Sequence, residues 1–370
     1  MNGLLIVPAI SGHIKNIGDY IQSIAQEQYW NNIDCYIERE KLASFHSDKK
    51  VNLIMQGWFM WDYTQFPPAS CINPFFISFH LTPLIADKLL TKESIEYLKK
   101  FEPIGCRDYN TKELLENKGI QSYYSGCLTL TLDLKYKSNV RNEKSYIIDP
   151  YIEIGGSKDI PKLQRIINLL SASIKNIPNI NKILNIKKKF FNCRCYRDTS
   201  LIGKIKELLM TISYYDTYSK IFTDDVLLNS EYITHLINES ELSEDGKLDM
   251  AREYINRYAK AKMIITSRIH AALPAISLET PTIFITSDVL ANPNNQSTPG
   301  GRFKGIIELL NCLELKGNKL YGNSEYMKNL LQEKIGIHTN IYNPDTYKPI
   351  REKLIEKTFE FVDKCNNYQT

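Results

Sequence analysis

The chain has 370 residues, of which 43% are hydrophobic, so it can bury a full core and is long enough for two domains of ordinary size. Its 46 basic and 42 acidic residues leave a net charge of +4, which argues against a nucleic-acid partner. No run approaches the roughly 20 apolar residues of a membrane helix, and no signal-peptide pattern opens the chain. Eight scattered cysteines fit a reducing compartment, so we expect a cytoplasmic protein.

Short apolar runs alternate with helical patterns through the first third of the chain. The patterns predict strands at residues 3–8, 34–37, 51–55, 75–79, 103–107 and 122–125, a loop at 9–19, and helices at 20–29, 92–100 and 111–118. Such alternation is typical of an α/β fold with a parallel sheet that is covered on both faces.

A polar segment without apolar periodicity, residues 133–144, predicts a linker, and a second alternating series follows it. This series predicts strands at residues 146–149, 183–186, 232–235, 261–265 and 281–285, and helices at 163–173, 201–209, 248–260, 271–278 and 347–365. We therefore expect a first domain over residues 1–133, a second over 145–345 and a final helical segment over 346–370. Two such halves would leave a cleft between them, which is the usual place for ligands.

The most informative residues are Ser267, Arg268 and His270. They stand where the predicted strand 261–265 ends and the predicted helix 271–278 begins. Ligands of open α/β sheets bind at that edge, and a helix N-terminus there favours anions. An arginine and a histidine at this place indicate an anionic substrate and proton transfer, unless Arg268 is only an ion-pair partner and His270 only a satisfied polar residue under a loop.

The predicted loop after the first strand holds a second group of candidates. Gly18 permits a tight turn and a close approach to a ligand, although the glycine spacing is not that of the dinucleotide fingerprint. Asp19 is either a functional carboxylate or only the N-cap of the next helix. The remaining candidates in this loop are His13, Lys15 and Asn16.

Other predicted strand ends also carry polar or aromatic side chains. Trp58 is predicted to lie in a loop, where it is either a platform for a sugar ring or a core aromatic. The further binding candidates are His80, Arg107, His235 and the small polar segment 125–132.

Three further segments have weaker claims. Residues 182–189 contain four lysines, which form either a solvated face or a peripheral contact with anionic lipid headgroups or a lipid diphosphate. Asp224 and Asp225 could hold a divalent ion, but adjacent aspartates usually face apart, and no metal site is expected. Cys193 and Cys195 lack the second pair of ligands that a zinc site needs.

Four of these segments together resemble the polysaccharide pyruvyl transferase family: Asn16 to Asp19, Gly105 to Asp108, Ser125 to Thr131, and Ser267 to Ala271. The resemblance runs over residues 3–310, and its most specific part is Ser-Arg-x-His-Ala with the following Pro-x-Ile-Phe strand. It implies a fold like that of the GT-B glycosyltransferases, with two Rossmann-like domains that face each other across a cleft and a C-terminal helix that crosses back to the first domain.

The resemblance also implies an activity. A pyruvyl group passes from phosphoenolpyruvate to a sugar of a bacterial cell-surface or capsular polysaccharide, or of its lipid-linked precursor, and forms a cyclic ketal without a cofactor. Arg268 and His270 match the expected donor-site residues. Arginine can hold a carboxylate or a phosphate in a bidentate fork, and histidine can donate a proton or bind the departing phosphate. Asp19 or His13 is the candidate base toward the acceptor.

Two other functions stay open at this point. A glycosyltransferase of the same fold would use a nucleotide-activated sugar, and a catalytically silent subunit would only bind sugar within a glycan assembly complex. For the transferase we expect Arg268 and His270 to face Asn16 and Asp19 across an open groove, because the reaction needs both halves.

Overall fold

A computed structural model describes residues 1–7, 14–194, 198–238, 242–287 and 303–367. The expected binding residue His13 and the loop 292–296 therefore lie outside the described residues. The chain begins with strand β1 (Asn2–Ile6), which is buried along its whole length. Short strands that are buried on both faces read as continuous apolar runs, and this is why the parallel strands could be predicted from the sequence.

The first half forms a six-stranded parallel sheet in the order β3-β1-β4-β5-β6-β7. Its strands after β1 are β3 (Cys35–Glu38), β4 (Val51–Phe59), β5 (Ile72–Leu81), β6 (Ile104–Cys106) and β7 (Ser122–Tyr124). Its helices are α1 (Ile17–Glu27), α2 (Ala86–Leu89), α3 (Lys92–Lys99) and α4 (Tyr109–Glu116). A 3₁₀ helix, Leu128–Thr131, and the short helix α5 (Asp133–Tyr136) lead out of this half.

The second half forms another six-stranded sheet, in the order β14-β13-β12-β11-β8-β9, in which only β14 runs antiparallel. Its strands are β8 (Ser145–Ile148), β9 (Glu231–Ile233), β11 (Met263–Thr266), β12 (Thr282–Ser287), β13 (Cys312–Lys316) and β14 (Lys319–Gly322). Its helices are α6 (Lys162–Lys175), α7 (Ile180–Asn192), α8 (Leu201–Tyr218), α9 (Asp224–Asn229), α10 (Glu244–Lys260), α11 (Ile269–Ser277) and α13 (Glu325–Leu330). The expected α/β architecture of two Rossmann-like domains is confirmed.

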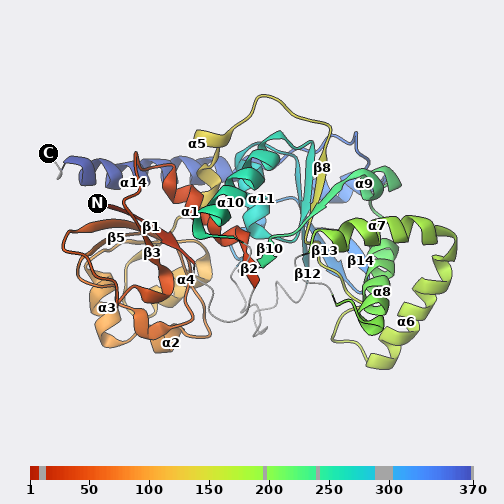
Figure 1. Ribbon diagram of the computed structural model, residues 1–370, viewed down its shortest axis with the longest axis horizontal. Helices are drawn as coiled ribbons and strands as arrows, with labels where there is room; N and C mark the ends of the chain where they lie inside the picture. Colours follow the sequence, from red (N-terminus) through yellow and green to blue (C-terminus); the bar gives the residue numbers. More distant parts are fainter. Residues whose placement is uncertain (8–13, 195–197, 239–241, 288–302, 368–370) are drawn as a thin grey trace.

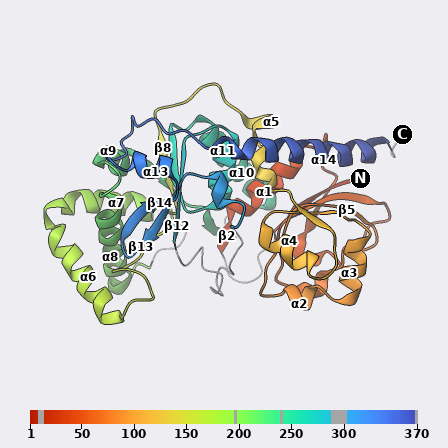
Figure 2. The ribbon, with the colours of Figure 1, turned by 180° about the vertical axis from the view of Figure 1, so that it is seen from behind.

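The two halves meet along helices rather than along their sheets. Helix α1 of the first half packs against α10 and α11 of the second, and one apolar core runs from β1 through these helices to the end of the chain. Figures 1 and 2 show α1, α10 and α11 between the two sheets. The shared core places the N-terminal ends of α1 and α11 side by side.

The last helix, α14 (Lys348–Asn367), follows the second half but packs on the first. Phe361 stacks on Phe75 of β5 with ring centroids 4.9 Å apart, and Arg351 Nη2 lies 2.6 Å from Asp133 Oδ2. Both ribbon views show α14 extending along the first half (Figures 1 and 2). The tail thus ties the two halves together.

Some local expectations were wrong. Residues 183–186 form part of helix α7 rather than a strand, because Ile183, Ile186 and Phe190 are buried at helical spacing. Strand β4 continues to Phe59, so Trp58 lies on a strand and not in a loop. Helix α1 begins at Ile17, inside the predicted loop, and residues 14–16 form strand β2 (Ile14–Asn16).

Candidate functional site

A small two-stranded sheet joins the halves at the start of α1. Strand β2 pairs antiparallel with β10 (Leu236–Asn238) of the second half, with Asn16 opposite Leu236. The Ile17 amide donates to the His235 carbonyl at 2.7 Å. These bonds fix the first turn of α1 against the second domain, so residues 16–19 are positioned by residues more than 200 positions away in the chain.

Gly18 lies directly against two histidines. A Cβ atom at Gly18 would stand 3.1 Å from His270 Cβ and 3.2 Å from His235 Nδ1, which is closer than ordinary van der Waals contact. The expectation of an open groove between Arg268 or His270 and this loop is therefore wrong at Gly18, where the halves touch. Asn16 is the N-cap of α1, because its Oδ1 accepts from the Gly18 amide at 3.1 Å, so Asp19 does not have the capping role.

Arg268 forms the ion pair that organises the second-domain side. It precedes α11, and its Nε donates to Asp149 Oδ2 at 2.9 Å. Within the described residues, its other guanidinium nitrogens have no hydrogen-bond partner, and the side chain is 33% exposed. The Nη edge is consequently free to hold an anion in a fork.

Asp149 follows strand β8 and binds two groups with one oxygen. Its Oδ2 accepts from the His235 amide at 2.9 Å and from Arg268. Burial by itself would raise the pKa of Asp149, but Arg268 and the His235 amide outweigh burial and hold it below the ordinary value. Asp149 is therefore a fixed negative charge that orients the arginine.

His235 is fully buried beside this pair. Its Nε2 lies 2.6 Å from the hydroxyl of Tyr258, and within the described residues Nδ1 has no hydrogen-bond partner. Burial lowers the pKa of His235 to about 3, Asp149 opposes that shift, and Arg268 adds to it. The imidazole is thus neutral at physiological pH and does not act as a cationic acid.

His270 occupies the first turn of α11, with 8% of its surface exposed. Ser267 supports the turn before it, because the Ser267 hydroxyl accepts from the Tyr151 amide at 2.8 Å. Arg268, His270 and Gly18 are accordingly gathered at one place where the two domains meet.

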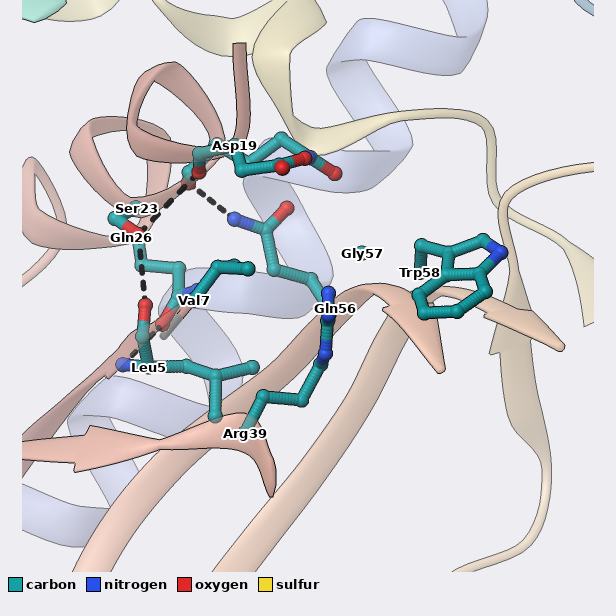
Figure 3. Close-up of a pocket in the computed structure, with 10 residues that line it drawn as sticks. Leu5, Val7, Asp19, Ser23, Gln26, Arg39, Gln56, Gly57 and Trp58 are labelled. Atoms are coloured by element: carbon teal, nitrogen blue, oxygen red, sulfur yellow. Dashed lines mark hydrogen bonds between the residues drawn. The ribbon is translucent and has the colours of Figure 1, made fainter. Parts of the chain in front are cut away.

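A pocket lies where α1 meets the ends of β1, β3 and β4 (Figure 3). The space among its lining atoms is about 220 Å³, a figure that includes open solvent, so the pocket is a partly open recess at the surface. Asp19 and Trp58 line it together, as does Gly57, whose φ of +92° favours glycine. The other lining residues are Leu5, Val7, Gln22, Ser23, Gln26, Arg39 and Gln56.

The pocket wall is rich in planar polar groups. Gln22 Nε2 donates to Asp19 Oδ1 at 3.2 Å, and Gln56 Nε2 donates to the Gln22 carbonyl. The two amide oxygens, Gln22 Oε1 and Gln56 Oε1, are buried without a hydrogen-bond partner in the described parts of the chain. Arg39 is 3% exposed, and its guanidinium lies 5.0 Å from the centre of the Trp58 ring. Such a wall suits hydroxyl groups on a ring.

His80 and Arg107 form a separate buried cluster around Asp108. His80 Nδ1 lies 2.5 Å from Asp108 Oδ2, and Arg107 Nε lies 3.8 Å from the same oxygen. Burial would raise the pKa of Asp108, but His80 and Arg107 bring it below its ordinary value. His80 and Arg107 do not line the pocket beside Asp19, and the role of this cluster in binding stays a prediction.

Lys15 is turned into the protein. It is 5% exposed, and its Nζ donates to the Val7 carbonyl at 2.8 Å. Asp224 Oδ2 lies 2.6 Å from Lys182 Nζ, so this carboxylate has an ion-pair partner within the protein. In the described parts of the chain, no group of three or more metal-ligating side chains is present.

Comparison with known proteins identifies the family. A family model described as polysaccharide pyruvyl transferase matches residues 15–289, which is well over half of the chain and includes Gly18, Arg268 and His270. The chain belongs to the polysaccharide pyruvyl transferase family. It is therefore a transferase, and a polysaccharide-modifying transferase implies a saccharide acceptor.

Two further comparisons add little to this assignment. The search of curated proteins found no match. Among solved structures, the chain is similar to UDP-GlcNAc 2-epimerase from Methanocaldococcus jannaschii, with 12% sequence identity, a TM-score of 0.40, and coverage of 97% of this chain and 100% of that chain.

The sequence left several site residues unnoticed. Asp149 had a usable signal, since it directly follows a buried strand. Arg39 similarly follows β3. Tyr258, Gln22 and Gln56 had none, because they lie inside regular elements and meet the site only through long-range packing.

Proposed function

We propose that this protein transfers the pyruvyl group of phosphoenolpyruvate to two hydroxyl groups of a sugar in a bacterial cell-surface polysaccharide or its lipid-linked precursor. The observation that carries the proposal is the Arg268 fork held by Asp149 next to His270, at the point where α1 of the other domain arrives. A partly exposed guanidinium edge beside a helix N-terminus suits a donor with a carboxylate and a phosphate.

The transfer of the pyruvyl group balances in atoms and protons. Both sugar oxygens bond to C2 of phosphoenolpyruvate, the C2–O bond to phosphate breaks, and the methylene carbon gains one proton to become a methyl group. The two hydroxyl groups release two protons; one replaces the proton delivered to the methylene carbon and the other leaves with the phosphate. We assign proton delivery or phosphate binding to His270 and anion binding to Arg268.

The acceptor sugar is assigned to the pocket on the first domain. Asp19 lines this pocket and is the neighbour in sequence of Gly18, whose backbone lies against His270, and this supports an acceptor site near the donor side. The unpartnered oxygens of Gln22 and Gln56 accept from hydroxyl groups, and Asp19 is the candidate base.

Thermal melting in the presence of donors tests the proposal. Phosphoenolpyruvate should raise the melting temperature because a ligand of the folded state stabilises it by mass action, about 2.7 kcal/mol at 100 times Kd. Inorganic phosphate and pyruvate, each offering one of the two anionic groups, serve as matched controls and should act more weakly. Stabilisation by nucleotide sugars with none by phosphoenolpyruvate would instead assign the chain to nucleotide-sugar transfer.

A further inference from the structure

The helices α6, α7 and α8 lie together at the end of the second domain far from α14 (Figures 1 and 2). Helix α6 has no buried residue. Its large aliphatic side chains follow helical spacing and stand in solvent: Leu163, Ile166, Ile167, Leu170 and Ile174 are 46–69% exposed. In a globular protein the apolar face of an amphipathic helix normally packs against the core, whereas the apolar face of α6 is exposed to solvent.

The neighbouring segments continue this exposure. The further exposed aliphatic side chains are Ile177, Ile180, Leu184, Leu201, Ile202 and Ile205, at 38–77%. Elsewhere in the described residues, only three other large aliphatic side chains, Leu84, Leu134 and Val140, are comparably exposed. We call the exposed aliphatic residues of 163–205 the apolar end. Their concentration at one end of the molecule indicates a surface that binds something.

The same segment is strongly basic. Residues 158–206 contain twelve lysines and arginines and only two aspartates, whereas the whole chain has a net charge of +4. Several of these lysines are exposed and take part in no ion pair within the described residues: Lys158, Lys162, Lys188, Lys204 and Lys206. Lys175, Lys182 and Lys187 pair with Asp216, Asp224 and Glu207, so the uncompensated charge of this segment lies on the exposed lysines just named.

We infer that the apolar end docks on an anionic lipid surface. Aliphatic side chains with lysines around them are the composition of helices that lie in the membrane interface, and anionic headgroups complement the charge. A second copy of the chain fits less well, since it would bring two strongly basic surfaces together. Among the described helices, none combines the length and the apolar character of a membrane span.

Docking would hold the protein beside lipid-linked sugars, but the inference does not require pyruvyl transfer. The protein could bind vesicles even if phosphoenolpyruvate is not its donor, and it could use phosphoenolpyruvate without binding vesicles. The two proposals are therefore tested separately.

Co-sedimentation of the full chain with vesicles tests the inference. Vesicles of phosphatidylglycerol and phosphatidylcholine should bind the protein, phosphatidylcholine alone should bind it much less, and 0.5 M salt should weaken binding. The triple variant Ile166→Ser, Leu170→Ser, Ile174→Ser should lose about ten-fold in partitioning for each side chain. The matched control, Leu84→Ser with Val140→Ser, should bind like the natural chain.

Charge reversal gives an independent measurement. Lys162→Glu with Lys204→Glu should reduce partitioning about five-fold or more for each lysine, and Lys49→Glu with Lys92→Glu, which are exposed elsewhere, should not. Equal binding to neutral and anionic vesicles, or unchanged binding by both variants of the apolar end, would overturn the inference. A dimer in light scattering that the triple variant dissociates, without vesicle binding, would assign the surface to a second copy.

Discussion

At the scale of single residues, Arg268 and His270 are given different tasks. Replacing Arg268 by Ala should remove the anion fork and weaken phosphoenolpyruvate binding by about 2 kcal/mol, or roughly thirty-fold. Replacing His270 by Gln should lower kcat by about 10²–10⁴-fold with little change in donor affinity, if it transfers a proton. Isothermal titration and steady-state kinetics separate the two effects.

The matched control for this pair is Arg268→Lys. It keeps a positive charge near Asp149 but loses the planar fork, so its donor affinity should fall between those of the natural chain and Arg268→Ala. Full activity of either the alanine or the glutamine variant would remove that residue from the catalytic site.

His235 should make the fold sensitive to acid. Its folded-state pKa of about 3 lies below the unfolded value near 6.5, so between these values the unfolded chain binds a proton that the folded chain does not. The free energy of unfolding should therefore fall as pH decreases below about 6.5, by up to about 1.4 kcal/mol per pH unit. His235→Gln should flatten this dependence between pH 6 and 4 in denaturant titrations.

The exposed His46 provides the control for the pH series. His46→Gln makes the same substitution at an exposed ring outside the core. A slope in His235→Gln equal to that of the natural chain would show that the buried imidazole is not the group that is protonated on unfolding.

At the scale of elements, the contact between the first turn of α1 and α11 tolerates no extra volume. Gly18→Ala places a methyl group 3.1 Å from His270 Cβ, an atom next to the backbone that cannot move aside cheaply. We expect a loss of about 1–3 kcal/mol in unfolding free energy and lower turnover. Gly246→Ala, in α10, meets only ordinary contacts and should be neutral or stabilising. Equal stability of both variants would contradict a tight contact between the domains.

The pocket formed by α1 and the ends of β1, β3 and β4 should bind the acceptor. Gln22→Leu removes a buried acceptor oxygen at similar volume and should raise the KM for the sugar about ten-fold. Stabilisation by phosphoenolpyruvate should be unaffected, because the donor is assigned to Arg268 and His270, which do not line this pocket. Gln121→Leu, at the exposed start of the β7 region, is the control. An unchanged acceptor KM in Gln22→Leu would place the acceptor elsewhere.

At the scale of the whole molecule, α14 secures the first domain to the second. Leu354 on this helix is 1% exposed within the shared core, so Leu354→Ala should cost about 2–5 kcal/mol of unfolding free energy. The exposed neighbour Lys353→Ala should cost little. Denaturant melts monitored by tryptophan fluorescence report the effect, since the rings of Trp30 and Phe361 of α14 pack edge-on with centroids 6.1 Å apart.

The site residues that could be predicted from the sequence are those whose position follows from the neighbouring residues in the chain. Arg268 and His270 stand between an apolar strand and a short helix, and that order placed them correctly at the edge of the second sheet. Trp58 was assigned to the wrong element because the polar Gln56 and Gly57 interrupt the apolar run of β4. The placement of residues 14–16 in a strand could not be predicted, because three residues carry no period of their own.

The sequence by itself determined the family, the α/β class, and the order of most strands and helices, because strand and helix periodicities are properties of short segments. Only the tertiary structure decided that β2 pairs with β10, that Gly18 touches His270, that Asp149 holds Arg268, and that Gln22 and Gln56 share a pocket with Asp19. Each of these contacts joins segments far apart in the chain, and their choice depends on which buried faces fit together. No local pattern records that fit.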